Sequence, residues 1–194
     1  MMELEHIDGG VRGRQRTYRI GRNGKRIIGC QVPAFISNGG YHLIDLGIYQ
    51  DGIIDCWGLV DFEGFKEKVA AGWVTAEVPA GAKISKHQLF YGTAEGLTFY
   101  VTNEDLVKEV KACIALLQRK HTPADTCWQA FERFIKHPTE EDRATIAESF
   151  EQVAEHTRQY ILGHQDWKAG PLKLIIARRE TSEDLENWRH DFEV

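Results

Sequence analysis

The run YHLIDLGIYQ (41–50), the dipeptide DG (51–52) and the run IIDCWGLV (53–60) follow one another without a break. Apolar and β-branched side chains dominate both runs, as is typical of strands. Asp-Gly supplies the two positive-φ residues that a type I′ turn requires. We therefore expect a β-hairpin with a two-residue loop, and the neighbouring segments can be placed around it.

The loop length decides which side chains share a face of this hairpin. A two-residue loop places Ile48 opposite Asp55 and Leu46 opposite Trp57, with His42 on the same face. Both faces are then largely apolar, which predicts a central hairpin in a sheet covered on both sides. A three-residue loop would shift the pairing and undo these assignments.

The segments on either side of the hairpin also have strand and helix patterns. Residues 17–22 and 25–30 flank Asn23-Gly24, which predicts a second tight hairpin. Asp61 is a suitable N-cap for a helix over 62–70, with Gly72 beyond its end. Further strand-like runs lie at 73–78, 83–85, 88–91 and 97–101. This part predicts an antiparallel β-sheet or partly open barrel with one packed helix.

At Thr102 the apolar spacing changes from two residues to that of a helix. Thr102 and Asp105 have the spacing of a capping box, and an apolar stripe continues to about Lys120. Further helices are expected from Pro123 and over 139–163. We expect these three helices to form a helical unit, followed by a returning strand at 172–177 and a helix at 183–190. The predicted class is α+β.

The predicted organisation has four parts that together could still form one domain. They are a flexible Gly-rich arm (1–15), a β-rich domain (16–101), the helical unit (102–164), and a strand with a terminal helix that packs back (165–194).

Composition excludes several classes of protein. The chain has 194 residues, 42% of them hydrophobic, and a net charge of −5, which argues against wholesale disorder. The aliphatic runs are far shorter than the roughly 20 residues of a membrane span. The N-terminal residues lack the apolar region of a secretory signal, so we expect a cytoplasmic protein. Its widely spaced thiols, expected to be reduced and packed, are Cys30, Cys56, Cys113 and Cys127.

Positive charge is concentrated near the N-terminus. Residues 9–44 have a net charge of +7, whereas 45–194 contain 17 basic against 26 acidic residues. One interpretation is a nucleic-acid interface at 12–26, because arginines neutralise phosphates. The alternative, which we prefer, is that the basic segment folds back on the acidic body or on an acidic partner. The candidate binding residues are Arg12, Arg14, Arg16, Arg19 and Arg22.

A motif in the central hairpin points to a family. Residues 54–64 have the form I-D-C-W-x-L-V-D-x-E-G, with Val32-Pro33 and Asn38-Gly39 before it and Gly72-Trp73 after it. With these residues, the stretch 32–90 resembles a family of uncharacterised bacterial proteins. The resemblance implies a bacterial, cytoplasmic protein and supplies no catalytic residues.

Asp55 and His42 are the candidates for catalysis, and Trp57 and Asp55 are candidates for binding. A carboxylate on an apolar face must be hydrogen-bonded, paired with a cation or shifted in pKa. We prefer a structural interpretation of Asp55, in which its carboxylate is partly exposed to solvent near the turn and accepts hydrogen bonds from turn amides or an arginine. The acidic residues of the hairpin point in divergent directions, so no metal site is expected, and no motif predicts a cofactor.

The absence of a convergent catalytic set and the segregated charge favour a non-enzymatic protein that binds another macromolecule. We expect that macromolecule to be a protein, bound in the manner of an immunity or regulatory protein. The alternatives are a small hydrolase or nuclease that uses Asp55, and nucleic-acid binding through 12–26. The sequence predicts neither the partner nor the oligomeric state.

Overall fold

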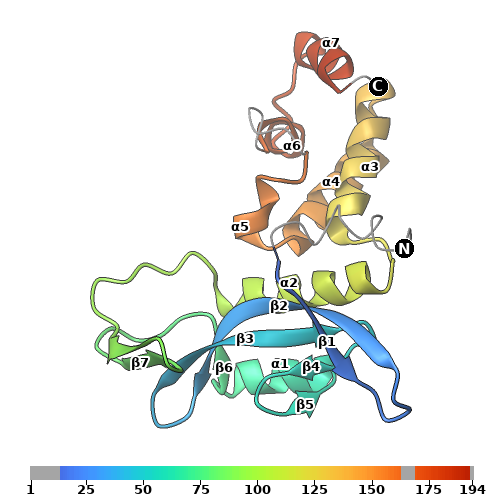
Figure 1. Cartoon of the computed structure of the whole chain (residues 1–194). Coiled ribbons are helices and arrows are strands. Elements are labelled where there is room, and N and C mark those ends of the chain that lie inside the picture. The colour runs from blue at the N-terminus through green and yellow to red at the C-terminus, as the bar shows by residue number, and fades with distance from the viewer. Residues whose placement is uncertain (1–13, 163–168, 193–194) are drawn as a thin grey trace. The chain divides into compact units, whose positions relative to one another are not determined.

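A computed structural model describes residues 14–162 and 169–192 (Figure 1). The chain divides into two compact units, Met1–Lys120 and His121–Val194. The first is a β-sheet with two helices and the second is helical, which confirms the α+β class. Arg12 and most of the expected N-terminal arm lie outside the described residues.

The sheet of the first unit is built on one long hairpin. β2 (Arg26–Ser37) pairs with β3 (Tyr41–Tyr49) along its length. The outer edge of β2 pairs with β1 (Arg16–Ile20) and β6 (Val74–Thr75), and β3 pairs with β4 (Ile54–Asp55) and β7 (Lys83–Lys86). Two strands complete the sheet, β5 (Leu59–Val60) beside β4 and β8 (Phe90–Thr93) beside β7. All these pairs are antiparallel except β3–β7.

Both predicted tight turns contain three residues rather than two. Tyr49 N donates to Ile53 O at 2.9 Å and Ile48 pairs with Ile54, so the pairing is shifted by one residue from the prediction. Gly52 has φ 84° whereas Asp51 does not have a positive φ. This is the geometry of a type I turn closed by a left-handed glycine. The loop after β1 has the same form, with Gly24 at φ 73°.

The predicted strand over 53–60 is interrupted by a second reversal. β4 ends at Asp55 and β5 begins at Leu59, and the two strands pair with each other. Between them Trp57 has φ 61° and Gly58 has φ 145°. His42, Asp55 and Trp57 were predicted to share one face of the hairpin, and the shifted register and this reversal show that prediction to be wrong. Asp55 pairs with Gly47, so it lies on the face opposite that of His42.

Two helices cover one face of this sheet (Figure 1). α1 (Phe62–Ala70) begins at the predicted N-cap, where the Asp61 carboxylate accepts from Gly64 N at 2.8 Å. α2 (Asn103–Leu117) begins with the predicted Thr102–Asp105 capping box. The core beneath them contains side chains from β2, β3, α1 and α2, among them Ile36, Leu46, Ile48, Phe65, Leu106 and Val110. α2 was expected to belong with the following helices, but it packs in the core of the first unit.

On the opposite face of the sheet, aromatic side chains of the first unit lie over the strands. Tyr49 is 7% exposed and its ring lies across Gly29 and Gly47, neither of which has a side chain to obstruct it. Farther along the sheet, Phe35 and Phe99 are in edge-to-face contact with ring centroids 6.0 Å apart. The segment 97–101, predicted as a strand, pairs with none of the described strands, and Phe99 lies within it.

The described helices of the second unit are α3 (Pro123–Lys136), α4 (Glu140–Gln152), α5 (Glu155–Arg158), α6 (Gly170–Ile176) and α7 (Ser182–Asp191). All of them except α5 contribute side chains to one apolar core. The expected helix over 139–163 stops at Gln152. The expected strand over 172–177 is wrong, because that segment forms α6, whose Leu172 and Ile175 lie in the helical core. The predicted terminal helix is confirmed as α7.

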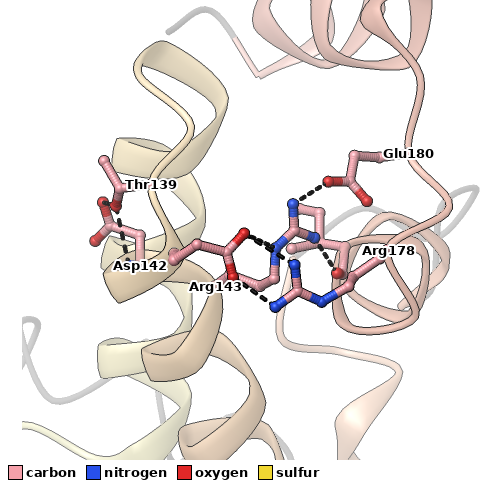
Figure 2. A network of polar contacts seen from close by, with 7 residues as sticks. Thr139, Asp142, Arg143, Arg178 and Glu180 are labelled. Carbon is pink, nitrogen blue, oxygen red and sulfur yellow. Dashed lines mark hydrogen bonds and ion pairs between the residues drawn. The ribbon is translucent and has the colours of Figure 1, made fainter.

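One arginine ties α4 to the segment that follows α6 (Figure 2). Arg143 donates to the Glu180 carboxylate, to the Ile175 carbonyl oxygen and to Glu140. Its guanidinium also lies over the Phe134 ring, 4.9 Å from the centroid. The side chains of Arg143 and Glu180 are only 14% and 10% exposed, so this ion pair is largely removed from water.

In the part of the chain that the structure describes, no helix combines the length and the apolar character needed to cross a membrane.

Candidate functional site

The turn between β4 and β5 holds Trp57 in an unusual backbone conformation. Bulky residues rarely adopt positive φ, because the Cβ atom crowds the following carbonyl group. Hydrogen bonds close the turn on both sides, from Gly58 N to Asp55 Oδ1 at 3.3 Å and from Cys56 N to Gly58 O at 3.3 Å. The Cys56 side chain is fully buried, whereas Trp57 is 51% exposed. The buried Cys56 side chain therefore holds the turn against the core, and the indole of Trp57 lies at the surface.

The Trp57 ring contacts His42 at the start of β3. Their ring centroids are 5.2 Å apart and the ring planes are inclined by 33°. Two of the three predicted site residues of the hairpin thus come together, although through a turn that the sequence did not predict.

Both ring nitrogens of His42 are hydrogen-bonded. Nε2 lies 3.0 Å from the Asn38 carbonyl oxygen and Nδ1 lies 2.8 Å from Ser85 Oγ. A carbonyl oxygen only accepts, so Nε2 carries the hydrogen of the neutral ring. Nδ1 then has the free lone pair and accepts from the Ser85 hydroxyl group. Ser85 was not a predicted site residue, because the parallel β3–β7 pairing that brings it to His42 has no local sequence signal.

Asp55 does not join this cluster. It pairs with Gly47, on the sheet face that also carries Tyr49. Its carboxylate is half-buried and accepts a hydrogen bond from Gly58 N of the β4–β5 turn, not from an amide of the predicted turn at 51–52. Burial, with Asp55 as a nearby negative charge, raises the pKa of the Tyr49 phenol.

Arg14 and Arg19 of the basic segment contact acidic and aromatic side chains of their own unit. Arg14 forms an ion pair with Glu109 at 2.8 Å, and both side chains are at most 20% exposed. Arg19 forms an ion pair with Asp51 and lies over the Tyr49 ring, 5.3 Å from its centroid. Arg16 lies in β1, and Arg22 is exposed in the turn. These contacts favour the interpretation in which the basic segment folds back on its own acidic side chains.

Comparison with protein families divides the chain close to the boundary between its compact units. A family described as a domain of unknown function, DUF7638, matches residues 16–121, and a second such domain, DUF7639, matches residues 122–191. The chain belongs to the DUF7638 family. No curated protein and no solved structure matches it significantly.

The DUF7638 region also exposes a group of apolar side chains that the sequence analysis did not identify. They lie on the β7–β8 hairpin and in the segment that follows it, with Phe90 and Tyr91 on opposite faces of β8. We use the name hairpin cluster for this set by its place in the chain: Leu89 (75% exposed), Phe90 (40%), Tyr91 (74%), Leu97 (51%) and Tyr100 (83%). The sequence pattern of this region predicts strands, and it carries no signal for the exposure of these side chains.

The four cysteines are buried and free. Burial raises the pKa of the Cys56 thiol and raises that of Cys127 to about 11. Cys30 differs, since a hydrogen bond with Cys113 and the nearby Arg14 charge lower its pKa. Within residues 14–162 and 169–192, no three His, Cys, Asp or Glu side chains converge as ligands for a metal ion.

Proposed function

We propose that this protein acts by binding another protein, in the manner of an immunity or regulatory protein. The observation that carries the proposal is the hairpin cluster, with its exposed Leu89, Tyr91 and Tyr100. Groups of exposed apolar side chains on soluble proteins often mark interaction sites, and tyrosine and phenylalanine are enriched at interfaces. An aromatic side chain that becomes fully desolvated against a partner is a common source of binding energy.

Charge supports a basic partner. Residues 121–194 contain 9 basic and 15 acidic residues, a net charge of −6, whereas residues 1–120 have a net charge of +1. An acidic unit attracts a basic protein over distance and raises the rate of encounter. The hairpin cluster would then supply the contacts that hold the partner.

The alternatives have less support. A hydrolase built on Asp55 would need a base close to it, but His42 lies on the other face of the sheet. Nucleic-acid binding through 12–26 would compete with the internal ion pairs of Arg14 and Arg19. A bacterial origin and a cytoplasmic location stay predictions from the sequence.

The binding role is tested by affinity purification with three baits from cells that express the protein naturally. The baits are the wild-type chain, the double variant Tyr91→Ser/Tyr100→Ser, and Tyr160→Ser, which alters a tyrosine that is 68% exposed outside the hairpin cluster. We expect one protein to be captured by the wild type and Tyr160→Ser but lost with the double variant. Calorimetry with that purified protein should then show binding weakened at least ~10-fold, or about 1.4 kcal/mol, by the double substitution.

The proposal fails if every captured protein is retained equally by all three baits. It also fails if the purified partner binds the wild type and the double variant with equal affinity.

A further inference from the structure

Ser85 of β7 is paired in register with His42 of β3, and these two strands form the parallel pair of the sheet. We infer that Ser85 is an activated nucleophile that takes an acyl group from an ester, with His42 as its general base. This inference is independent of the proposed binding role and adds a chemical activity to the DUF7638 region.

The hydrogen bonds have the order that nucleophile activation requires. A serine hydroxyl is a weak nucleophile until an adjacent base removes its proton, and a third group must hold that base in place. Here the Ser85 hydroxyl donates to His42 Nδ1 at 2.8 Å, and His42 Nε2–H donates to the Asn38 carbonyl at 3.0 Å. The Asn38 carbonyl therefore selects the tautomer whose lone pair faces Ser85.

Each member of the pair has an exposed aromatic neighbour. Strand register places Ser85 opposite His42 on one side and opposite Tyr91 of β8 on the other. Residues directly opposite each other point to the same face, so these three side chains form a row. Trp57 contacts the His42 ring from the turn after β4, which pairs with the same edge of β3 as β7 does. Trp57 and Tyr91 are each at least 51% exposed, so an ester with an apolar or aromatic group can contact aromatic surface next to the nucleophile or next to its base.

The Trp57 backbone is a second observation that points to this place. A left-handed conformation costs a non-glycine residue roughly 1–2 kcal/mol, and such strain is concentrated at functional sites. Trp57 has this conformation although the residue after it is a glycine. Burial of the indole does not offset this strain, because the side chain is 51% exposed. In this backbone conformation the indole ring contacts His42.

The reaction proceeds in two balanced steps. Ser85 Oγ attacks the ester carbonyl carbon while His42 Nδ1 takes the hydroxyl proton. The bond to the alcohol oxygen then breaks, and the alcohol leaves with that proton. In the second step water attacks the acyl carbon and gives its proton to His42, and the carboxylic acid departs as the serine hydroxyl group is restored.

The test uses a fluorophosphonate probe on the full-length chain, with the modified residue located by peptide mapping. The probe forms a bond from phosphorus to Ser85 Oγ and expels fluoride. We expect labelling at Ser85 in the wild type and none at position 85 in Ser85→Ala. His42→Gln should label at least ~10-fold more slowly, since general-base assistance contributes 10²–10⁴-fold. The matched control is Ser182→Ala, which removes an exposed serine at the start of α7.

A measurement on the wild type keeps the test decisive if His42→Gln fails to fold. Native protein should label at Ser85 at least ~10-fold faster than the urea-unfolded chain, because only the folded chain brings His42 to Ser85. Equal rates in the native and unfolded chains would overturn the inference. Labelling confined to Tyr91 or to lysines, or an unchanged rate in a folded His42→Gln variant, would overturn it as well. Loss of labelling and loss of partner capture are separate readouts, so the two proposals can fail independently.

Discussion

A Cβ atom added at Gly47 would lie 2.7 Å from the Tyr49 hydroxyl oxygen, because the phenol ring of Tyr49 lies back along its own strand. At Gly29, which pairs with Tyr49 across β2–β3, an added Cβ would lie 2.7 Å from a ring carbon of the same tyrosine and 2.5 Å from the Ile48 carbonyl oxygen. The ring therefore requires glycine at position 47, and the ring together with the β3 backbone requires it at position 29.

Gly47→Ala should destabilise the first unit by about 1–3 kcal/mol, because the added methyl group overpacks the Tyr49 ring. The measurement is urea unfolding monitored by hydrogen exchange in β2 and β3. Gly92→Ala is the control, since an added Cβ there meets no atom within 4 Å and should change stability little. A cost for Gly47→Ala that persists in a Tyr49→Leu background would contradict the explanation.

Tyr49 should make stability depend on pH in the alkaline range. Its pKa is raised above the ordinary value of 10.0, mainly by burial, so the folded state favours the neutral phenol. Above about pH 10 the unfolded chain releases this proton more readily, and the contribution of Tyr49 to stability falls as pH rises. The free energy of unfolding of the wild type minus that of Tyr49→Phe should therefore fall between about pH 8 and about pH 11. If this signed difference stays constant or rises, Tyr49 is not the responsible group.

Replacing Trp57 should cost little stability. Trp57→Gly relieves a left-handed backbone worth roughly 1–2 kcal/mol and removes one aromatic contact of similar size, about 0.5–1.5 kcal/mol. We expect a net change within about 1 kcal/mol in chemical unfolding. Trp188→Ala is the contrast, because that side chain is 1% exposed in the helical core and its loss should cost about 3–5 kcal/mol. A comparable loss at Trp57 would give the residue a structural role instead.

Arg143→Gln should destabilise the helical unit by about 2 kcal/mol, because it leaves the Glu180 carboxylate without its charged donor. Hydrogen exchange in α4 and α6 reports the effect locally. Arg133→Gln breaks an ion pair with Asp142 in the same unit, but Arg133 is 56% exposed, so its loss should cost less than about 1 kcal/mol. Equal effects of the two substitutions would argue against a special role for the buried pair.

The thiols of the native protein should react slowly with a thiol reagent near pH 8, and all four should react rapidly in urea. Burial blocks access, and the pKa of Cys127, raised to about 11, leaves little thiolate there. Cys30, whose pKa is lowered, should be modified first when the native chain is left with the reagent. Rapid modification of Cys56 or Cys127 in the native state would contradict the observed packing.

Features encoded locally were predictable from the sequence. The caps at Asp61 and Thr102 hydrogen-bond to amides only three residues away, so the helix starts follow from short motifs. The turn lengths were not predictable, because Asn-Gly and Asp-Gly fit both a two-residue loop and a three-residue loop that ends in a left-handed glycine. The run at 172–177 was ambiguous for a different reason: a short aliphatic segment suits a buried strand or a buried helix equally.

The candidate site depended on features beyond local sequence. His42 and Trp57 were both named from the sequence, but the contact between them requires a bulky residue at φ 61°, which no residue pattern predicts. Ser85 reaches His42 through pairing between strands that are separated in the chain by β4, β5, α1 and β6. The resemblance centred on the motif at 54–64 pointed to the same turn without explaining it.

The Tyr49 ring covers the backbone of Gly29 and Gly47 on its face of the sheet, and the Arg19 guanidinium lies over that ring. A partner that bound to this face would have to displace first the guanidinium and then the ring. We therefore expect recognition by the β-rich unit at its strand edges and loop tips, and we expect sequence variation within the family to be tolerated there before it is tolerated beneath the phenol.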